Sequence, residues 1–279
     1  LHVLHIKNLK EQIITYIKIN KNMILVCGDI HGRRFWKKPC ENIEDYDKVI
    51  FLGDYLDPYD FEGITVIDAI KNFEEIIEFK KNNVDKVILL LGNHDMPYFS
   101  SDYYFFSHYH CRHSEKHHKT IATLFEQNRD FFKIAHVEND VLFTHAGVES
   151  GWLENVVCCE EKDINKICDK INSLLENKDT LRQLYSISSR RGGYDKYPSC
   201  IWADVHDMMW DEEQLKGPDA YIAPIQTMRQ VFGHTIQAYY NTEGQIVFGE
   251  AKEFGNCKMI DTANAYLLNT NDFTIQKQI

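Results

Sequence analysis

The sequence lacks any apolar run that approaches the length of a membrane span, and its N-terminus lacks the basic and then apolar order of a signal peptide. Its eight cysteines contain no CxxC pair. A chain of 279 residues can bury enough apolar surface to fold without disulfides. We therefore expect reduced thiols in a soluble, cytoplasmic protein.

Positive charge is also scarce, with 31 Lys and Arg against 42 Asp and Glu and a formal net charge of -11. This balance argues against sequence-independent binding of nucleic acid, because such binding depends on Lys and Arg that neutralise phosphates. A compact basic site is still compatible with this charge balance. Internal repeats and low-complexity linkers are missing too. The length predicts one domain over residues 1–279, with two small domains as the alternative.

What the sequence does contain is a repeated order of apolar run, polar loop and amphipathic helix. Apolar runs of strand length occupy residues 23–27, 48–52, 86–91, 141–144 and 229–232. The spacing of apolar residues predicts helices over 8–20, from 65 to 77 and over 164–175. This order predicts an α/β fold with parallel strands and crossover helices. Short apolar runs between residues 246 and 268 predict β hairpins that close a second sheet.

Each of the five runs ends in a short loop that carries polar side chains. The loops are Gly28-Asp29-Ile30-His31-Gly32, Gly53-Asp54-Tyr55-Leu56-Asp57, Gly92-Asn93-His94-Asp95, Thr144-His145-Ala146-Gly147 and Gly233-His234-Thr235. In open parallel sheets, ligands bind beyond the carboxyl ends of the strands, where all these loops would meet. If extended geometry continues through Ile30, Asp29 and His31 leave the backbone on one face. A Gly-Asp or Gly-Asn pair alone is an ordinary turn, so the prediction depends on the five loops together.

Carboxylate, imidazole and amide oxygen together suit two borderline divalent cations such as Mn²⁺, Fe²⁺ or Zn²⁺. The candidate metal ligands are Asp29, His31, Asp54, Asn93, His145 and His234. A shared Asp54 could hold two ions about 3.5 to 4 Å apart, where a bridging water becomes a hydroxide nucleophile near neutral pH. His94 is the candidate donor of a proton to the departing oxygen, and Asp57 is the candidate to hold its ring and raise its pKa.

These motifs, in this order, resemble the calcineurin-like metallophosphoesterase superfamily, and most closely its phosphoprotein phosphatase branch. That branch includes serine/threonine phosphatases and bacterial diadenosine tetraphosphatases. Trp202-Ala203-Asp204 is similar to its Trp-Ser-Asp element. The resemblance implies a four-layer αββα sandwich with mixed central sheets, a dinuclear metal centre, and phosphoester hydrolysis without a covalent intermediate. With Mn²⁺ as the favoured metal, the leading hypothesis is a phosphatase for phosphomonoesters, phosphoserine and phosphothreonine proteins included.

Two positions depart from the family pattern. The second motif of the phosphatases continues with Arg-Gly, whose arginine binds the substrate phosphate, but here Pro58 follows Asp57. Arg190 or Arg191 could supply that contact together with Asn93, because Gly-Gly follows the arginines; an ordinary solvated basic turn is the alternative. Phosphodiesterase-like relatives carry a further histidine where Ile236 stands. Its absence favours a phosphatase.

A histidine-rich and aromatic stretch lies between residues 96 and 135. Five of its histidines surround Cys111, namely His108, His110, His113, His117 and His118. A zinc site is one interpretation, but the spacing matches no standard ligand pattern. We favour an insertion, helical around Ile121 and Phe125, that walls one side of a cleft.

Two further functions stay open on the sequence alone. One is a nucleotide hydrolase that acts on dinucleoside polyphosphates or cyclic nucleotides. The other is a metal-stabilised interaction module that has lost turnover together with the motif arginine. The side chains of Asp57 and His94 argue against the second, because a scaffold does not require an acid.

Overall fold

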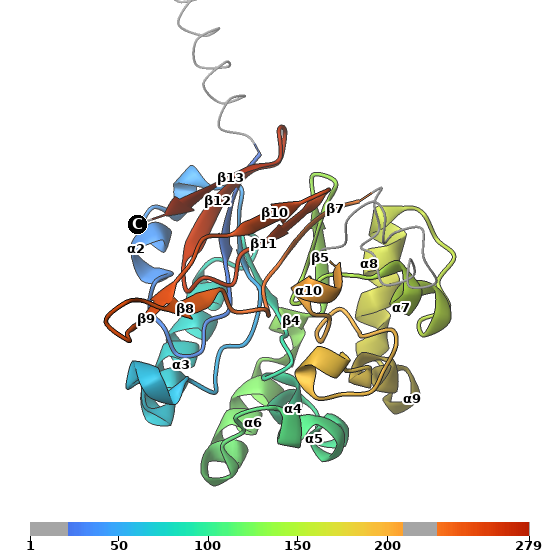
Figure 1. Cartoon of the computed structure of the whole chain (residues 1–279), viewed down its shortest axis with the longest axis horizontal. Coiled ribbons are helices and arrows are strands. Elements are labelled where there is room, and N and C mark those ends of the chain that lie inside the picture. The colour runs from blue at the N-terminus through green and yellow to red at the C-terminus, as the bar shows by residue number, and fades with distance from the viewer. Residues whose placement is uncertain (1–21, 209–227, 279) are drawn as a thin grey trace, which may run out of the picture.

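The computed structural model describes residues 22–208 and 228–278, so the helix predicted over residues 8–20 lies outside the described part. Two mixed sheets form its centre (Figure 1). The first has the order β13-β12-β1-β2-β3-β4, with bounds Thr274–Gln278, Ala265–Asn269, Met23–Cys27, Lys48–Phe51, Val87–Leu90 and Phe132–Lys133. The second has the order β10-β11-β7-β6-β5, with bounds Lys252–Phe254, Cys257–Met259, Arg229–Phe232, Val141–Thr144 and Ala135–Glu138. A separate pair joins β8 (Ala238–Tyr240) and β9 (Ile246–Phe248).

Helices flank the two sheets. They are α2 (Lys37–Cys40), α3 (Val66–Asn82), α4 (Met96–Phe99), α5 (Ser101–Ser107), α6 (His118–Gln127), α7 (Ser150–Asn155), α8 (Ile164–Asn172), α9 (Lys178–Leu181) and α10 (Val205–Met208). Short 3₁₀ turns occupy Ile43–Asp45, Asp60–Glu62, His108–His110, Glu115–His117, Arg129–Phe131, Ser173–Leu175, Arg182–Tyr185 and Ser189–Arg191. In Figure 1, α3 lies on the side of the first sheet, and α7 and α8 lie on the side of the second.

Alternating side chains of β1 show how the layers pack. Ile24 and Val26 belong to the core between the sheets, which also contains Phe143 of β6. Leu25 points the opposite way, into a cluster that contains Phe73 of α3. Such alternation is the consequence of the two-residue period of a strand. The predicted αββα sandwich with mixed sheets is confirmed.

The helix predicted from residue 65 illustrates the local agreement between sequence and structure. Thr65 caps α3 by accepting a hydrogen bond from the N–H of Asp68, which satisfies one of the free donors of the first turn. Ile70, Phe73 and Ile77 form its buried face. The predicted apolar spacing therefore packs α3 against the first sheet.

The hairpins of the tail do not all lie where the sequence places them. β11 extends the second sheet, as predicted, but β9 pairs with β8 apart from both sheets, and β12 and β13 join the first sheet beside β1. Val26 pairs with Tyr266 and Ile24 with Leu268 in antiparallel register. The prediction is wrong for this hairpin because Tyr266 and Leu268 fill the core between the sheets from the β1 side.

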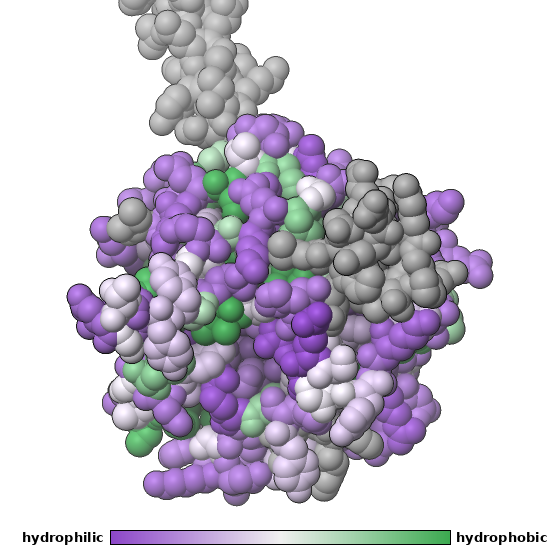
Figure 2. Space-filling model, in the orientation of Figure 1, coloured by the Kyte–Doolittle hydropathy of each residue, from purple (hydrophilic) through white to green (hydrophobic). Residues whose placement is uncertain are grey.

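The face seen in Figure 2 is mainly hydrophilic, and its hydrophobic side chains form only small groups. Within residues 22–208 and 228–278, no helix has both the length and the apolar character that crossing a membrane requires.

Candidate metal centre

The five polar loops meet at one edge of the two sheets. β1, β2 and β3 are parallel neighbours in the first sheet, and β6 and β7 are parallel neighbours in the second. Their carboxyl ends surround a cavity of about 300 Å³. It is lined by His31, Asp54, Tyr59, Asn93, His94, His110, Arg112, Arg190, Arg191, Trp202 and His234. The structure therefore brings most of the predicted site residues together.

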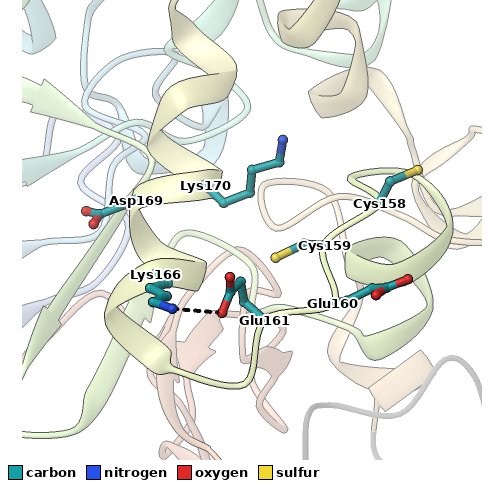
Figure 3. A pocket seen from close by; sticks show the side chains of 7 residues that line it. All are labelled: Cys158, Cys159, Glu160, Glu161, Lys166, Asp169 and Lys170. Carbon is teal, nitrogen blue, oxygen red and sulfur yellow. Dashed lines mark ion pairs between the residues drawn. The ribbon is translucent and has the colours of Figure 1, made fainter.

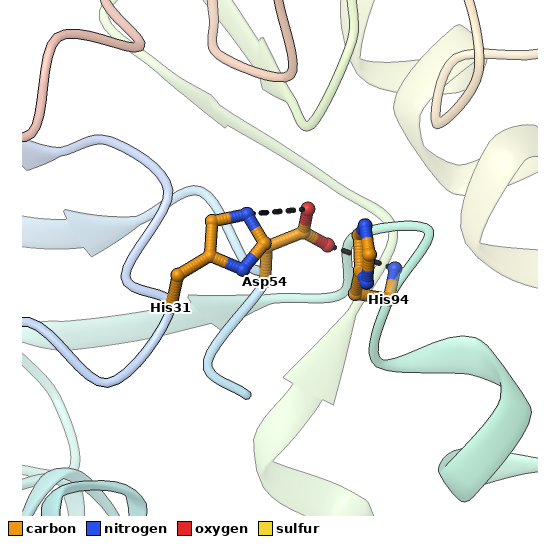
Figure 4. A group of neighbouring side chains, drawn as sticks. All are labelled: His31, Asp54 and His94. Carbon is orange, nitrogen blue, oxygen red and sulfur yellow. Dashed lines mark hydrogen bonds and ion pairs between the residues drawn. The ribbon is translucent and has the colours of Figure 1, made fainter. Parts of the chain in front are cut away.

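The carboxylate of Asp54 lies at the centre of this cavity and is 2% exposed. Its Oδ2 lies 3.4 Å from Nε2 of His31 and 3.5 Å from Nε2 of His145. Figure 4 shows the rings of His31 and His94 on either side of this carboxylate. Asp54 belongs to two groups of potential ligands whose atoms lie within 4.8 Å of one another, one with His31 and His94 and one with His145 and His234.

Two of the imidazoles are oriented by backbone carbonyls. The Nδ1–H of His31 donates to the carbonyl of Leu56 at 2.7 Å, and that of His145 donates to the carbonyl of Leu52 at 2.9 Å. Such bonds fix the tautomer and leave the lone pair of Nε2 for a cation, an arrangement that is usual around metal-binding histidines. Nε2 of His145 in turn lies 2.9 Å from Oδ1 of Asn93.

Asp29 is buried nearby, but its local geometry differs from the prediction. Its carboxylate accepts hydrogen bonds from the N–H of His234 at 3.0 and 3.1 Å, and it belongs to neither ligand group. His31 has a φ of 43°, so the extended geometry predicted through Ile30 does not continue to it. The cause is the next loop, since the N–H of His31 donates to the carbonyl of Asp54.

Four of the predicted site residues have a left-handed backbone. The φ angles are 43° for His31, 52° for Asp54, 54° for Asp57 and 69° for His234. Non-glycine residues rarely adopt such angles, which cost of order 1–3 kcal/mol each and persist only where the surrounding structure imposes them. Their concentration around one cavity is an independent indication of a functional site.

Negative charge and unpaired polar atoms are also concentrated here. Burial, and then the charge of Asp54, raise the pKa of Asp29 to about 8. Both carboxylate oxygens of Asp261 and Nε2 of His234 are buried without a hydrogen-bond partner among the described residues. Cβ atoms at Gly92 and Gly233 would overlap the carboxylates of Asp54 and Asp29. Since burying carboxylates is costly without positive charge, this donor set fits divalent cations.

The carboxylate of Asp57 holds the ring of His94. Oδ2 of Asp57 lies 2.8 Å from Nδ1 of His94, and Oδ1 accepts a hydrogen bond of 2.6 Å from the hydroxyl of Tyr98. Burial lowers the pKa of His94 to about 3, while burial raises that of Asp57 to about 7. The predicted rise in the pKa of His94 is therefore wrong, because desolvation of the imidazolium outweighs its attraction to the carboxylates.

Comparison with protein families agrees with this geometry. The family model for calcineurin-like phosphoesterases matches residues 23–235, a range that contains all five loops. The chain belongs to the calcineurin-like phosphoesterase family. It is accordingly a hydrolase of phosphoesters, from a family whose members depend on a dinuclear metal centre.

Solved structures of low sequence identity share the fold of this phosphoesterase. A cold-active protein tyrosine phosphatase aligns with 92% of this chain and 78% of its own, with 16% identity and a TM-score of 0.51. The cold-active protein-tyrosine phosphatase of the psychrophile Shewanella sp. aligns with 92% and 80%, with 16% identity and a TM-score of 0.50. No match was found among curated proteins.

The two arginines predicted to contact phosphate, Arg190 and Arg191, lie near the cavity of the phosphoesterase together with a third, Arg112. Nε of Arg191 lies 2.8 Å from Oδ2 of Asp204, and its Nη2 donates to Oγ1 of Thr235 at 2.8 Å. These contacts hold the side chain of Arg191 in place, so it does not belong to a solvated turn. Arg190 and Arg191 both line the cavity. The sequence does not predict Arg112, which also lines it, because nothing in residues 96–135 indicates its partners.

Asp261 is a second residue that sequence reasoning missed. It follows β11, which pairs in parallel with β7, so Asp261 arrives beside His234 at the same edge as the other loops. A signal was present in the sequence, since Asp261 also follows an apolar strand. Because the sequence predicts a hairpin in this region, Asp261 is not among the five predicted loops.

Within the described part of the histidine-rich stretch, the structure groups no set of ligands for the zinc site considered above. Among the described residues, both candidate ligand groups lie around Asp54. Nε2 of His113 instead lies 3.1 Å from Nδ1 of His118, and the ring of His113 stacks on Tyr98. Ile121 and Phe125 of α6 are fully buried in the cluster that packs against the first sheet, so this stretch contributes to the core.

A larger hollow, of about 690 Å³, lies near α8 and contains none of the predicted site residues. Figure 3 shows the side chains that line it: Cys158, Cys159, Glu160, Glu161, Lys166, Asp169 and Lys170. Lys166 lies 3.5 Å from Glu161 there, and both side chains are exposed. Size alone therefore does not locate the candidate metal centre of this phosphoesterase.

Two of the loops that carry candidate ligands, at residues 53–57 and 92–95, are tied together by Asp95, which is fully buried. Its carboxylate accepts hydrogen bonds from the N–H groups of Asp54, Tyr55 and Gly92 at 2.7, 3.0 and 2.8 Å. An Asp95→Ala variant would leave these buried donors unpaired, at about 1–3 kcal/mol each. We expect its free energy of unfolding, measured in urea, to fall by about 3 kcal/mol or more. An equal loss in Asp60→Ala, where the carboxylate is exposed, would contradict this role.

Proposed function

We propose that this chain is a dinuclear metal-dependent phosphatase that hydrolyses phosphomonoesters. The observation that supports this most directly is the buried carboxylate of Asp54, which is shared by two groups of imidazole ligands. A carboxylate shared by two ligand groups can hold two cations close together. Such a pair stabilises the attacking and the leaving oxygen of an in-line displacement at phosphorus.

The proposed ligands are those that the sequence predicts. Asp29, His31 and Asp54 would hold one cation, and Asp54, Asn93, His145 and His234 would hold the other. Mn²⁺ is the proposed metal, with Fe or Zn²⁺ as alternatives that the same donors accept. When bound, such cations neutralise phosphate oxygens and lower the pKa of a bound water.

We assign the proton that the leaving oxygen needs to the pair of Asp57 and His94. Because the pKa of Asp57 is raised to about 7 and that of His94 is lowered to about 3, one proton is held between them near neutral pH. The ring of His94 would give a proton from Nε2 to the departing oxygen as Nδ1 receives one from Asp57. Asn93, Arg190 and Arg191 would orient the phosphate.

Metal dependence is the first test of this proposal. We expect hydrolysis of p-nitrophenyl phosphate to be stimulated by Mn²⁺ and abolished by EDTA. Mn²⁺ should also raise the melting temperature, because a ligand that binds only the folded state stabilises it. A higher melting temperature without any hydrolysis would instead support a module without turnover. Full activity in EDTA would exclude the cation pair.

A second candidate function has one observation in its favour. An apolar groove of about 140 Å³ adjoins the metal cavity and shares Tyr59 with it. Phe61 and Tyr239 also line this groove, and both are about half exposed. Aromatic side chains of this kind stack on nucleobases, which favours dinucleoside polyphosphates or cyclic nucleotides as substrates. The ratio of kcat/KM between such nucleotides and phosphopeptides distinguishes the two functions.

A further inference from the structure

The guanidinium of Arg112 lies in the metal cavity although it comes from the histidine-rich stretch. Its central carbon lies 3.6 Å from the ring centroid of Tyr59. Nε and Nη2 donate to the carbonyl of Asp57 at 3.1 and 3.0 Å. Nη2 also lies 3.3 and 3.5 Å from the two ring nitrogens of His31. The guanidinium is therefore held in one place beside a candidate metal ligand.

Two other arginines near the cavity, Arg33 and Arg191, have carboxylate partners. Arg33 pairs with Glu62 at 2.7 Å, and Arg191 pairs with Asp204 at 2.8 Å. Arg112 has no carboxylate at ion-pair distance within residues 22–208 and 228–278, and its Nη1 donates no hydrogen bond to the residues described there. Its positive charge is thus available to an anion that enters the cavity.

We propose that Arg112 binds the phosphate of the substrate in place of the guanidinium that the second motif lacks. This inference rests on the proposed phosphatase function. The substitution of the motif arginine by Pro58 is followed directly by Tyr59, the ring on which Arg112 stacks. The loop that carries Pro58 where the family pattern has arginine therefore also carries the ring on which Arg112 stacks.

The physical basis is the planar shape of the arginine side chain. A guanidinium that stacks on an aromatic ring keeps its N–H groups in its own plane above the ring face, free to donate sideways. Because the stacking and the two bonds to Asp57 hold the side chain before substrate arrives, little rotamer entropy is lost on binding. The remaining donors then make charge-assisted hydrogen bonds to phosphate oxygens.

Arg129 offers a matched control in the same stretch. Its guanidinium stacks on Phe99 at 4.0 Å and donates to the carbonyl of Phe99 at 3.1 Å, and it does not line the metal cavity. Arg112→Ala, Arg112→Lys, Arg129→Ala and Arg129→Lys are compared with the unchanged chain, all loaded with Mn²⁺. Two quantities are measured: kcat/KM for a phosphomonoester, and the dissociation constant of inorganic phosphate by calorimetry.

We expect Arg112→Ala to lower kcat/KM about 100-fold, as the loss of charge-assisted hydrogen bonds to phosphate predicts, and to weaken phosphate binding at least tenfold. Arg112→Lys should recover part of this loss because it keeps the charge but not the planar fork. Added guanidinium ion should partly restore Arg112→Ala. Neither Arg129 variant should differ from the unchanged chain by more than about threefold.

The inference is overturned if Arg112→Ala binds phosphate and turns over substrate as Arg129→Ala does. In that outcome the phosphatase function stands. If the unchanged chain hydrolyses no phosphomonoester, the proposed function fails, but the calorimetric comparison still decides whether Arg112 binds phosphate. Should Arg112→Ala fail to fold, as shown by its circular dichroism spectrum, Arg112→Gln replaces it with a planar side chain without charge and must show the same losses.

Discussion

Asp54→Asn should lower kcat/KM for a phosphomonoester by about 10⁴-fold, which corresponds to ~5 kcal/mol of lost transition-state stabilisation. The reason is that one carboxylate lies in both candidate ligand groups, so a single change removes negative charge from two cation sites at once. Asparagine keeps the shape of the side chain and can still accept the hydrogen bond of 2.9 Å from the N–H of His94. The fold should therefore survive while the function is lost.

The measurement has two parts, which separate binding from catalysis. Metal content is determined after dialysis against Mn²⁺, and we expect less bound metal in Asp54→Asn than in the unchanged chain. Asp60→Asn, which replaces an exposed carboxylate in the same connection, serves as the matched control and should retain full activity. Two equivalents of Mn²⁺ and normal turnover in Asp54→Asn would refute a shared ligand.

His94→Asn should lower kcat for an alkyl phosphomonoester by about 10²–10⁴-fold, the usual contribution of a general acid. The loss should be much smaller for p-nitrophenyl phosphate, because its leaving group departs as a stable anion and needs little protonation. Asp57→Asn should also lower kcat more for the alkyl phosphomonoester than for p-nitrophenyl phosphate. Its loss should be smaller than that of His94→Asn, since an amide can still orient the ring but cannot supply a proton. Steady-state kinetics with both substrates measures this difference.

The control for this prediction is another histidine that pairs with an acid. Nε2 of His136 lies 3.2 Å from Glu138 on β5, outside the cavity. His136→Asn should therefore leave kcat unchanged for both substrates. A loss in His94→Asn that is the same for both leaving groups would show that His94 does not act as the acid.

The convergence of the loops could be predicted from sequence because each piece of evidence was local. Four of the five apolar runs end at a glycine followed by an acid, amide or imidazole, the fifth leads directly into His145, and parallel strands bring their carboxyl ends to one edge. Asp54, His31 and His145 meet for that reason. The sequence did not indicate that Asp29 would bond to the backbone of His234, since this depends on how β1 and β7 approach across two sheets.

Properties that depend on burial could not be predicted in the same way. The motif placed Asp57 next to His94 correctly, but the direction of the pKa shift of His94 follows from desolvation, which no motif records. Arg112 had no sequence signal, since it is 55 positions from the carbonyl that it contacts. The position of β12 was mistaken because the alternation of an antiparallel strand does not identify its partner.

The pairing of β12 with β1 joins the strand that is synthesised first among the described strands to one of the last. A nascent chain that has emerged as far as His234 carries all five loops, but β1 still lacks the neighbour that completes its sheet. Since chains emerge from the ribosome N-terminus first, the first sheet stays incomplete until β12 has emerged. We therefore expect ribosome-bound chains that end before Ala265 to be inactive, and hydrolysis to begin only once β12 and β13 have emerged.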